Sequence, residues 1–116
     1  MILSFKPQFK EKILNGSKIH TIRGVTNRWF PGRKIHFATG VRTKNYNCFK
    51  EGECIGLQKI YISSFLEYIE IDGRTLTVNQ EMQLASNDGF DSLHDFYKWF
   101  DKDFQGVIIH WTDKKY

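Results

Sequence analysis

The sequence predicts a single α+β domain in which a few short helices flank a small β-barrel. The chain has 116 residues, which is the length of one domain. Its 41% of hydrophobic and 16% of aromatic residues can form a core without disulfides or metals. Several segments alternate polar and apolar residues as strands do, and no repeat, low-complexity tract or linker divides the chain. We therefore treat residues 1–116 as one folding unit.

The first half of the chain is predicted to hold one short helix among strands. Pro7 sits where the helix begins, because a residue without a backbone N–H costs nothing in a first turn. Phe9, Ile13 and Leu14 share one helical face, and Gly16 ends the helix. The expected strands are 2–5, 18–23 and 34–40, and an irregular basic loop is expected at 41–52.

The second half is predicted to add strands and two helices. Gly56 marks a bulge or bend in a long strand at 53–62, and Asp72 and Gly73 signal the turn of a hairpin at 67–77. A helix from residue 79 ends near Asp88, and Asp91 caps a second helix over 92–104. The apolar spacing assigns Leu93, Phe96, Tyr97, Trp99 and Phe100 to the core, and 106–111 is a final strand.

Charge is distributed unevenly along the sequence. Residues 1–50 contain eleven Lys and Arg and one acidic residue, whereas residues 51–116 contain six Lys and Arg and twelve acidic residues. The basic half also carries Trp29, Phe30, Tyr46 and Phe49. Cations interleaved with aromatic rings favour an anionic or nucleotide-like ligand, although a solvated surface is the ordinary explanation of a charge run.

Several functional classes are disfavoured by the sequence. No apolar run approaches the roughly 20 residues of a membrane span, and the N-terminus lacks the pattern of a signal peptide. Cys48 and Cys54 fit no zinc pattern, and the four histidines show no ligand spacing. We expect reduced thiols in a cytoplasmic protein without metal or organic cofactor, with a hairpin disulfide as the minor alternative.

The segment GSKIHTIR, residues 16–23, concentrates polar residues that could carry chemistry. In a regular strand Thr21 and Arg23 face one way and His20 faces the other. A hydroxyl, the Lys18 ammonium and a guanidinium on one side would form an anion clamp. They could also form a reaction centre, because a buried lysine among cations can lose its proton and activate a hydroxyl. Ordinary strand residues with outward-pointing cations remain the alternative.

The order of motifs along the chain resembles one protein family. The pattern ILNGSKIHTIR is followed by PGRKIHF, TGVRTK and a late NDGFDSLHDFYKWF. This pattern resembles the activating-signal-cointegrator homology (ASCH) domain, a member of the PUA-like superfamily, over residues 5–111. The resemblance implies a PUA-like barrel with a basic cleft that takes RNA or a nucleotide.

Some small bacterial ASCH proteins are amidohydrolases that remove the acetyl group from acetylated cytidine. The resemblance carries their catalytic roles to Lys18 and Thr21, and to Asp88 as the downstream acid. In those relatives the acid is a Glu, one methylene longer. This chain also has a long basic loop, TGVRTKNYNCF, that the smallest of them lack.

Three functions follow as hypotheses. The first is a module that binds RNA or a modified nucleoside through Lys18 and Arg23, together with a set of basic and aromatic residues: Arg28, Trp29, Arg42, Lys44 and Tyr46. The second is an amidohydrolase acting through Lys18, Thr21 and Asp88. The third and weaker one is a ribonuclease using the same cleft. Each of three residues also has an interpretation without a ligand. Trp29 could plug the end of the barrel, and Lys44 could belong to a mobile solvated loop. Asp88 could simply mark the end of a helix.

Overall fold

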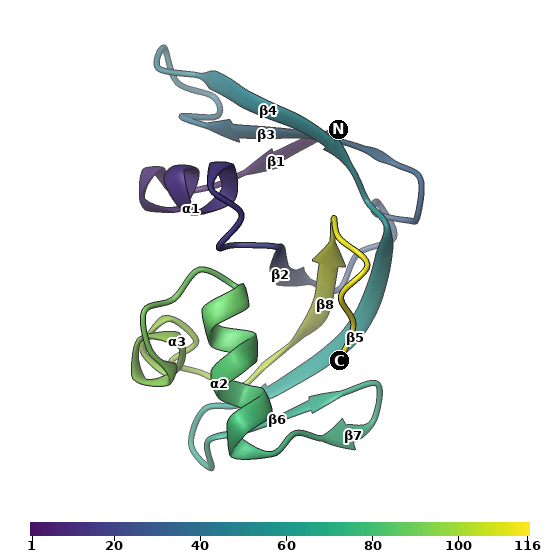
Figure 1. Ribbon diagram of the computed structural model, residues 1–116, viewed down its shortest axis with the longest axis vertical. Coiled ribbons are helices and arrows are strands. Elements are labelled where there is room, and N and C mark those ends of the chain that lie inside the picture. Colours follow the sequence, from purple (N-terminus) through teal and green to yellow (C-terminus); the bar gives the residue numbers. More distant parts are fainter.

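The computed structural model describes residues 1–116 and has an α+β architecture (Figure 1). The eight strands are β1 (Ile2–Ser4), β2 (His20–Gly24), β3 (Lys34–Thr39), β4 (Asn47–Glu53), β5 (Gly56–Ser63), β6 (Tyr68–Ile71), β7 (Arg74–Thr75) and β8 (Phe104–His110). The helices are a single 3₁₀ turn, η1 (Pro7–Phe9), then α1 (Lys10–Leu14), α2 (Val78–Asn87) and α3 (Leu93–Trp99). None of them is long and apolar enough to cross a membrane.

The strands form two sheets and not the closed barrel that the sequence predicts. One sheet has the order β1-β3-β4, with β1 parallel to β3, and the other is antiparallel with the order β2-β8-β5-β6-β7. The chain passes from one sheet to the other at Cys54 and Ile55. Cys54 N–H bonds to the main-chain oxygen of Arg33, just before β3, and Ile55 N–H bonds to that of His110 on β8. Because the pairing partner changes there, no ladder joins the two sheets.

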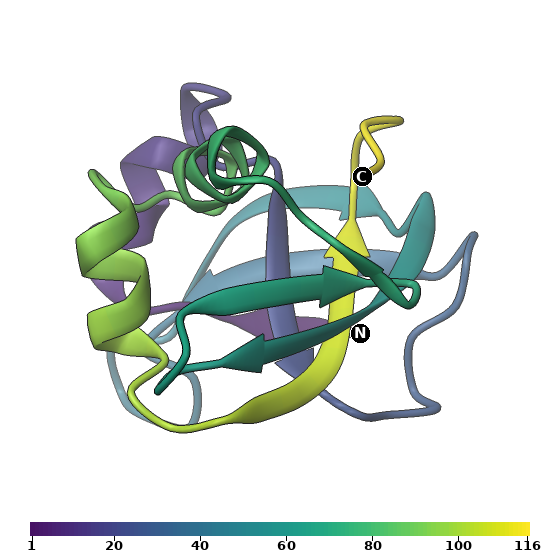
Figure 2. The same cartoon turned by 90° about the horizontal axis from the view of Figure 1, so that it is seen from below.

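The two apolar cores lie on opposite faces of β8. Figure 2 shows this strand running between the helices and the other strands. Ile108 belongs to a core of twelve buried residues between the larger sheet and helices α2 and α3. Ile109 belongs to a core of nine buried residues shared with β1, β3 and the N-terminal helical segment. Alternation along β8 therefore contributes to both cores, and the space between η1 and α3 lies at the boundary where these cores meet.

Most predicted elements are present, with four local corrections. The strands at 2–5, 18–23, 34–40 and 106–111, the turn at Asp72–Gly73 and the helix ending at Asp88 are confirmed. Residues 47–53 are a strand and not a loop, and the predicted long strand begins at Gly56. The N-cap of α3 is Ser92, whose hydroxyl accepts from Asp95 N–H. The helix ends at Trp99 because the backbone of Phe100, with a ψ of 71°, is no longer helical.

The fourth correction concerns the short helix α1. Ile13 is only 1% exposed, whereas Leu14, which the sequence predicts to share its helical face, is 48% exposed. A helix of five residues can bury only one narrow face, and in α1 this face carries Ile13, which packs into the smaller core. Both cysteines are free thiols, with Cys48 exposed and Cys54 buried.

We expect this difference in burial to separate two otherwise similar substitutions. Ile13→Ala should lower the free energy of unfolding by about 2–5 kcal/mol, because it removes buried methyl groups and leaves a cavity. Leu14→Ala should change it by only about 0.5 kcal/mol, as expected at an exposed position. Urea denaturation followed by circular dichroism measures both, and equal losses would contradict the packing of α1.

Candidate functional site

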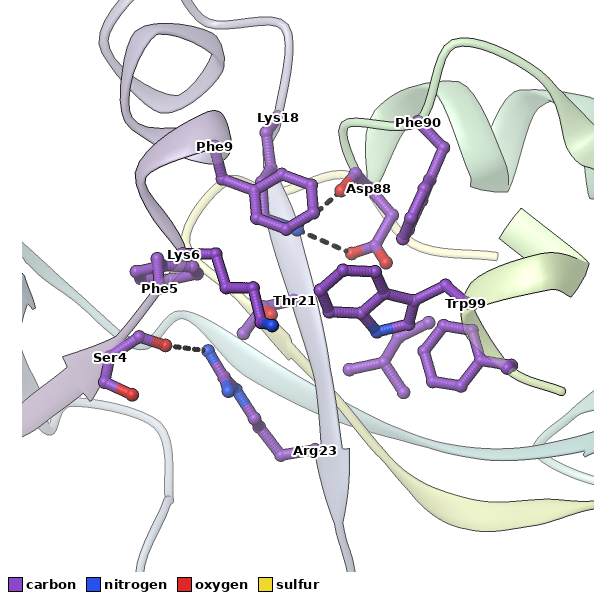
Figure 3. A pocket seen from close by; sticks show the side chains of 12 residues that line it. Ser4, Phe5, Lys6, Phe9, Lys18, Thr21, Arg23, Asp88, Phe90 and Trp99 are labelled. Atoms are coloured by element: carbon purple, nitrogen blue, oxygen red, sulfur yellow. Dashed lines mark hydrogen bonds and ion pairs between the residues drawn. The ribbon is translucent and has the colours of Figure 1, made fainter. Parts of the chain in front are cut away.

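The sequence-predicted trio Lys18, Thr21 and Asp88 lines one pocket of about 260 Å³ (Figure 3). Strand β2 and the segment before it supply Lys18 and Thr21, and the end of α2 supplies Asp88. Arg23 lines the same pocket, as its alternation with Thr21 predicts. Residues separated by about seventy positions in sequence thus meet at the boundary between the two cores.

Lys18 is held in place by backbone contacts on both sides. Gly16 has a φ of +84° and turns the chain after α1. Lys18 N–H then bonds to Lys12 O at 2.9 Å, and Ile19 N–H bonds to Asn87 O at 2.9 Å. The lysine is therefore fixed between the ends of α1 and α2, and its side chain is only 3% exposed.

The buried amine of Lys18 has a single carboxylate partner. Its Nζ donates to Asp88 Oδ1 at 3.0 Å and to the main-chain oxygen of Asp88, and it lies 4.8 Å from the centre of the Phe9 ring. Burial lowers the pKa of Lys18, Asp88 opposes this shift, and the positive charges of Arg23 and Lys12 add to it. Because burial is the largest cause, the neutral amine is more accessible here than in a free lysine.

Asp88 is the C-cap residue of α2 and turns its carboxylate toward the pocket. Its N–H bonds to Leu84 O at 2.9 Å, and Gly89 then leaves the helix with a φ of +94°. Both hydrogen bonds that the carboxylate receives go to Oδ1, from Lys18 and from His20. The second oxygen, Oδ2, is therefore free to accept a proton or a hydrogen bond from a ligand.

Thr21 and Arg23 each leave polar groups available in the pocket. Thr21 is 5% exposed, and no hydrogen bond within the protein engages its hydroxyl. Arg23 donates from Nη2 to Ser4 O and packs its guanidinium over the Phe5 ring at 5.1 Å, but its buried Nε has no partner. A buried donor without a partner is costly, so a ligand oxygen is its expected acceptor.

Aromatic rings form the walls of the pocket. Phe9, Phe90 and Trp99 contact one another edge to face, with ring centres 5.5–5.7 Å apart. Trp99 is 43% exposed, so its assignment to the core is wrong, and it forms part of the pocket wall with Lys6 5.6 Å above its ring. Sequence analysis missed Lys6 as a site residue, because nothing in the pattern around Pro7 separates it from other surface lysines.

Three of the other predicted ligand-binding residues line a second hollow of about 610 Å³. Arg28, Arg42 and Tyr46 lie there, together with Ser4, which also lines the first pocket. Two hydrogen bonds hold the loop that carries Arg42, because the Thr43 N–H and the Thr43 hydroxyl both donate to Gly40 O. No acidic residue lines this hollow.

Two predicted ligand-binding residues lie elsewhere. Trp29 is 7% exposed and belongs to the smaller core, which agrees with the plug interpretation and leaves little ring surface for stacking. Lys44 is exposed on the loop between Gly40 and Tyr46 but lines neither hollow. Among the aromatic residues that line the two hollows, Trp99 and Tyr46 are the well-exposed ones.

Comparison with known proteins adds no relatives. No family model, curated protein or solved structure matches this chain. The structure also holds no group of three or more His, Cys, Asp or Glu side chains that could bind a metal ion.

Gly89 offers a test of how closely the pocket is packed. A Cβ at this position would lie 3.1 Å from both Lys18 Cδ and Phe9 Cδ1, whereas a Cβ at Gly73 would meet nothing within 4 Å. Both glycines have positive φ, so alanine strains the backbone similarly in each case, by about 1 kcal/mol.

We expect Gly89→Ala to weaken ligand binding or turnover by about tenfold or more, because the added methyl group displaces Lys18, and Gly73→Ala to lower only stability. Titration calorimetry or kinetics beside thermal melts separates the two effects, and equal behaviour of both variants would contradict this packing.

Proposed function

We propose that the pocket binds the base of a modified nucleoside and that Lys18, Thr21 and Asp88 hydrolyse an acyl amide attached to it. The observation that carries this proposal is the placement of a buried amine with a lowered pKa, an unbonded hydroxyl and a carboxylate with one free oxygen in one small cavity. An activated hydroxyl and a nearby base are the two groups that covalent acyl transfer needs.

The size and walls of the pocket suit a single planar group. Its volume of about 260 Å³ lies just below the range of about 300–1,000 Å³ that is typical for drug-sized ligands. Phe9, Phe90 and Trp99 offer aromatic surfaces for packing against a base. A planar heterocycle with a short acyl group is therefore a better match than a longer chain or a protein segment.

The proposed reaction has two steps, each balanced by the residues present. Neutral Lys18 takes the proton of Thr21 as the threonine oxygen attacks the acyl carbon, and the oxyanion that forms lies against the Arg23 guanidinium. The C–N bond then breaks, and the proton passes from Lys18 through the Asp88 carboxylate to the leaving amine. Water, activated by neutral Lys18, hydrolyses the threonine ester to release the acid and restore the hydroxyl.

We also propose that the chain is a divergent relative of the ASCH domains. Support comes from the convergence of the motif residues Lys18 and Thr21 with the distant Asp88, since the resemblance assigns these three to one site. The two sheets, in this proposal, are an open form of the PUA-like barrel. A solved structure of a relative with the same strand order would test that assignment.

Hydrolysis of 4-acetylcytidine by the purified protein tests the proposed activity. We expect Lys18→Met and Thr21→Val each to lower kcat/KM by about 10²-fold or more, because each removes a group that transfers or receives a proton. Thr75→Val, on exposed strand β7, is the matched control and should change nothing. Absence of turnover by folded wild-type protein with excess nucleoside would exclude this substrate.

The pH profile gives an independent check on the role of Lys18. The reaction needs neutral Lys18, so kcat/KM should rise with pH and level off above the pKa of this lysine, which burial places below 10.5. Asp88 raises that pKa, and Asp88→Asn should therefore move the rise to lower pH even as it reduces the maximal rate. A rise that stays in place in Asp88→Asn would contradict the assignment.

RNA binding is the second candidate function, and the hollow lined by Arg28, Arg42 and Tyr46 favours it. Two guanidinium groups beside an exposed aromatic ring, with no acidic lining residue, suit a phosphate and a stacked base. Because Ser4 lines both hollows, a strand with one base in the Lys18 pocket would have its neighbouring nucleotide close to these arginines.

Salt-dependent binding of a short single-stranded RNA tests this second function. Arg28→Ala and Arg42→Ala should each weaken binding and reduce the slope of log K against log salt concentration by about 0.7, the value for one lost phosphate contact on a single strand. Lys102→Ala removes an exposed charge in the acidic half of the chain and serves as the control. Fluorescence anisotropy at several salt concentrations measures the slopes. Identical slopes in all three variants would place the RNA elsewhere or exclude it.

A further inference from the structure

His20 is a fully buried histidine that contacts the candidate site from behind. It lies on β2 beside Thr21 but faces the other side of the strand, as the alternation of the strand predicts. Its Nδ1 lies 3.1 Å from Asp88 Oδ1, and its Nε2 lies 2.7 Å from the Tyr116 hydroxyl. The Asn87 amide donates to the same hydroxyl at 2.9 Å. The sequence places His20 on the face opposite Thr21 but does not identify its partners.

A neutral imidazole gives a consistent assignment of protons to these contacts. The hydroxyl of Tyr116 accepts from Asn87, so its own hydrogen is available for His20 Nε2. Burial raises the pKa of Tyr116 to about 12, which keeps that hydrogen in place at neutral pH. His20 then carries its proton on Nδ1 and donates it to Asp88, which as a carboxylate can only accept. A neutral imidazole thus satisfies every contact.

Lys18 and His20 share a single oxygen of Asp88. Because both donate to Oδ1, neither occupies Oδ2, which stays available in the pocket. The hydrogen bond from His20 also withdraws negative charge from the oxygen that Lys18 contacts, which weakens the attraction between that oxygen and the lysine proton. Without His20 the carboxylate could rotate and present both oxygens to Lys18, which would tighten the ion pair.

His20 packs edge to face against two further titratable side chains, His110 and Tyr116, each with ring centres 5.4 Å from its own. Burial lowers the pKa of His110 to about 4, and the charges of Lys115 and Asp72 also act on that ring. His110 is therefore neutral near pH 7. On the other side of Asp88, the cations that act on Lys18 are Arg23 and Lys12.

We propose that His20, oriented by Tyr116, is a positioning residue that holds Asp88 by one oxygen and keeps the other oxygen free for the ligand. The catalytic consequences rest on the proposed amidohydrolase function, whereas the effect on Lys18 does not. The geometry assigns the two faces of β2 different tasks. Thr21 and Arg23 face the ligand, and His20 supports the carboxylate that serves them.

Three variants separate the proposal from a purely structural role. His20→Leu removes the donor at similar volume. In His20→Asn the side-chain amide can take the place of Nδ1–H and still donate to Asp88. Tyr116→Phe keeps the ring and removes the hydroxyl that orients the imidazole. His94→Asn, at an exposed histidine on α3, is the matched control.

With 4-acetylcytidine as substrate, His20→Leu should lower kcat by about tenfold or more with little change in KM, because misplacing a reacting group slows chemistry more than binding. The rise of its pH profile should move to higher pH, because a tighter Asp88 contact stabilises the Lys18 ammonium. His20→Asn should restore most of the rate, and Tyr116→Phe should fall between. Equal losses in the Leu and Asn variants, or losses that follow only the melting temperatures, would overturn the proposal.

A measurement without substrate makes the two proposals separable. The pKa of Lys18, followed by NMR of ¹³C-labelled lysine side chains, should rise in His20→Leu and remain near the wild-type value in His20→Asn and His94→Asn. If the wild type hydrolyses nothing but this shift is seen, the amidohydrolase function fails and the positioning role stands. An unchanged Lys18 pKa in both His20→Leu and Tyr116→Phe would overturn the positioning role.

Discussion

The burial of the Lys18 amine is the constraint on which the rest of the site depends. An ammonium group withdrawn from water loses several kcal/mol of solvation unless nearby groups replace its hydrogen bonds. Here the replacements come from a single residue, Asp88, through its carboxylate and its main-chain carbonyl, with the face of Phe9 beside them. The carbonyl lies at the C-terminal end of α2, where the helix dipole favours a cation. Each charge of this pair offsets part of the desolvation free energy that the other would lose if it were buried without a partner.

This pair sits where it does because the molecule has two cores that meet along β8. Phe5 and Phe9 belong to the smaller core, and Ile22 and Phe100 belong to the larger one, yet all four line the pocket. A boundary between two packed cores leaves space that neither fills. Polar groups placed there are desolvated by the aromatic walls while they remain reachable by a ligand, which is the combination that perturbs ionisation at functional sites.

Strand β2 links the chemistry of the pocket to its support. Its alternation sends Thr21 toward the pocket and His20 toward the buried side of Asp88, so the pocket hydroxyl and the imidazole that contacts the carboxylate are fixed by the same backbone. The second hollow is joined to the first through Ser4 on β1, and its arginines come from loops. The second hollow is thus built largely from loop residues, whereas β2 and the end of α2 supply polar groups of the first.

The sequence alone determined the features that depend on neighbouring residues. The alternation of residues 18–23, the Asp72–Gly73 turn and the end of α2 at Asp88 follow from local periodicity and backbone preference. The motif resemblance selected Lys18, Thr21 and Asp88 in advance. Only tertiary structure decided which strands pair, so the expected barrel became two sheets. Strand β4 could not be recognised from the sequence because none of its residues is buried. Tertiary structure likewise placed Trp29 inside, Trp99 on the pocket wall and His20 against Asp88, because long-range packing, not local pattern, sets which surfaces meet.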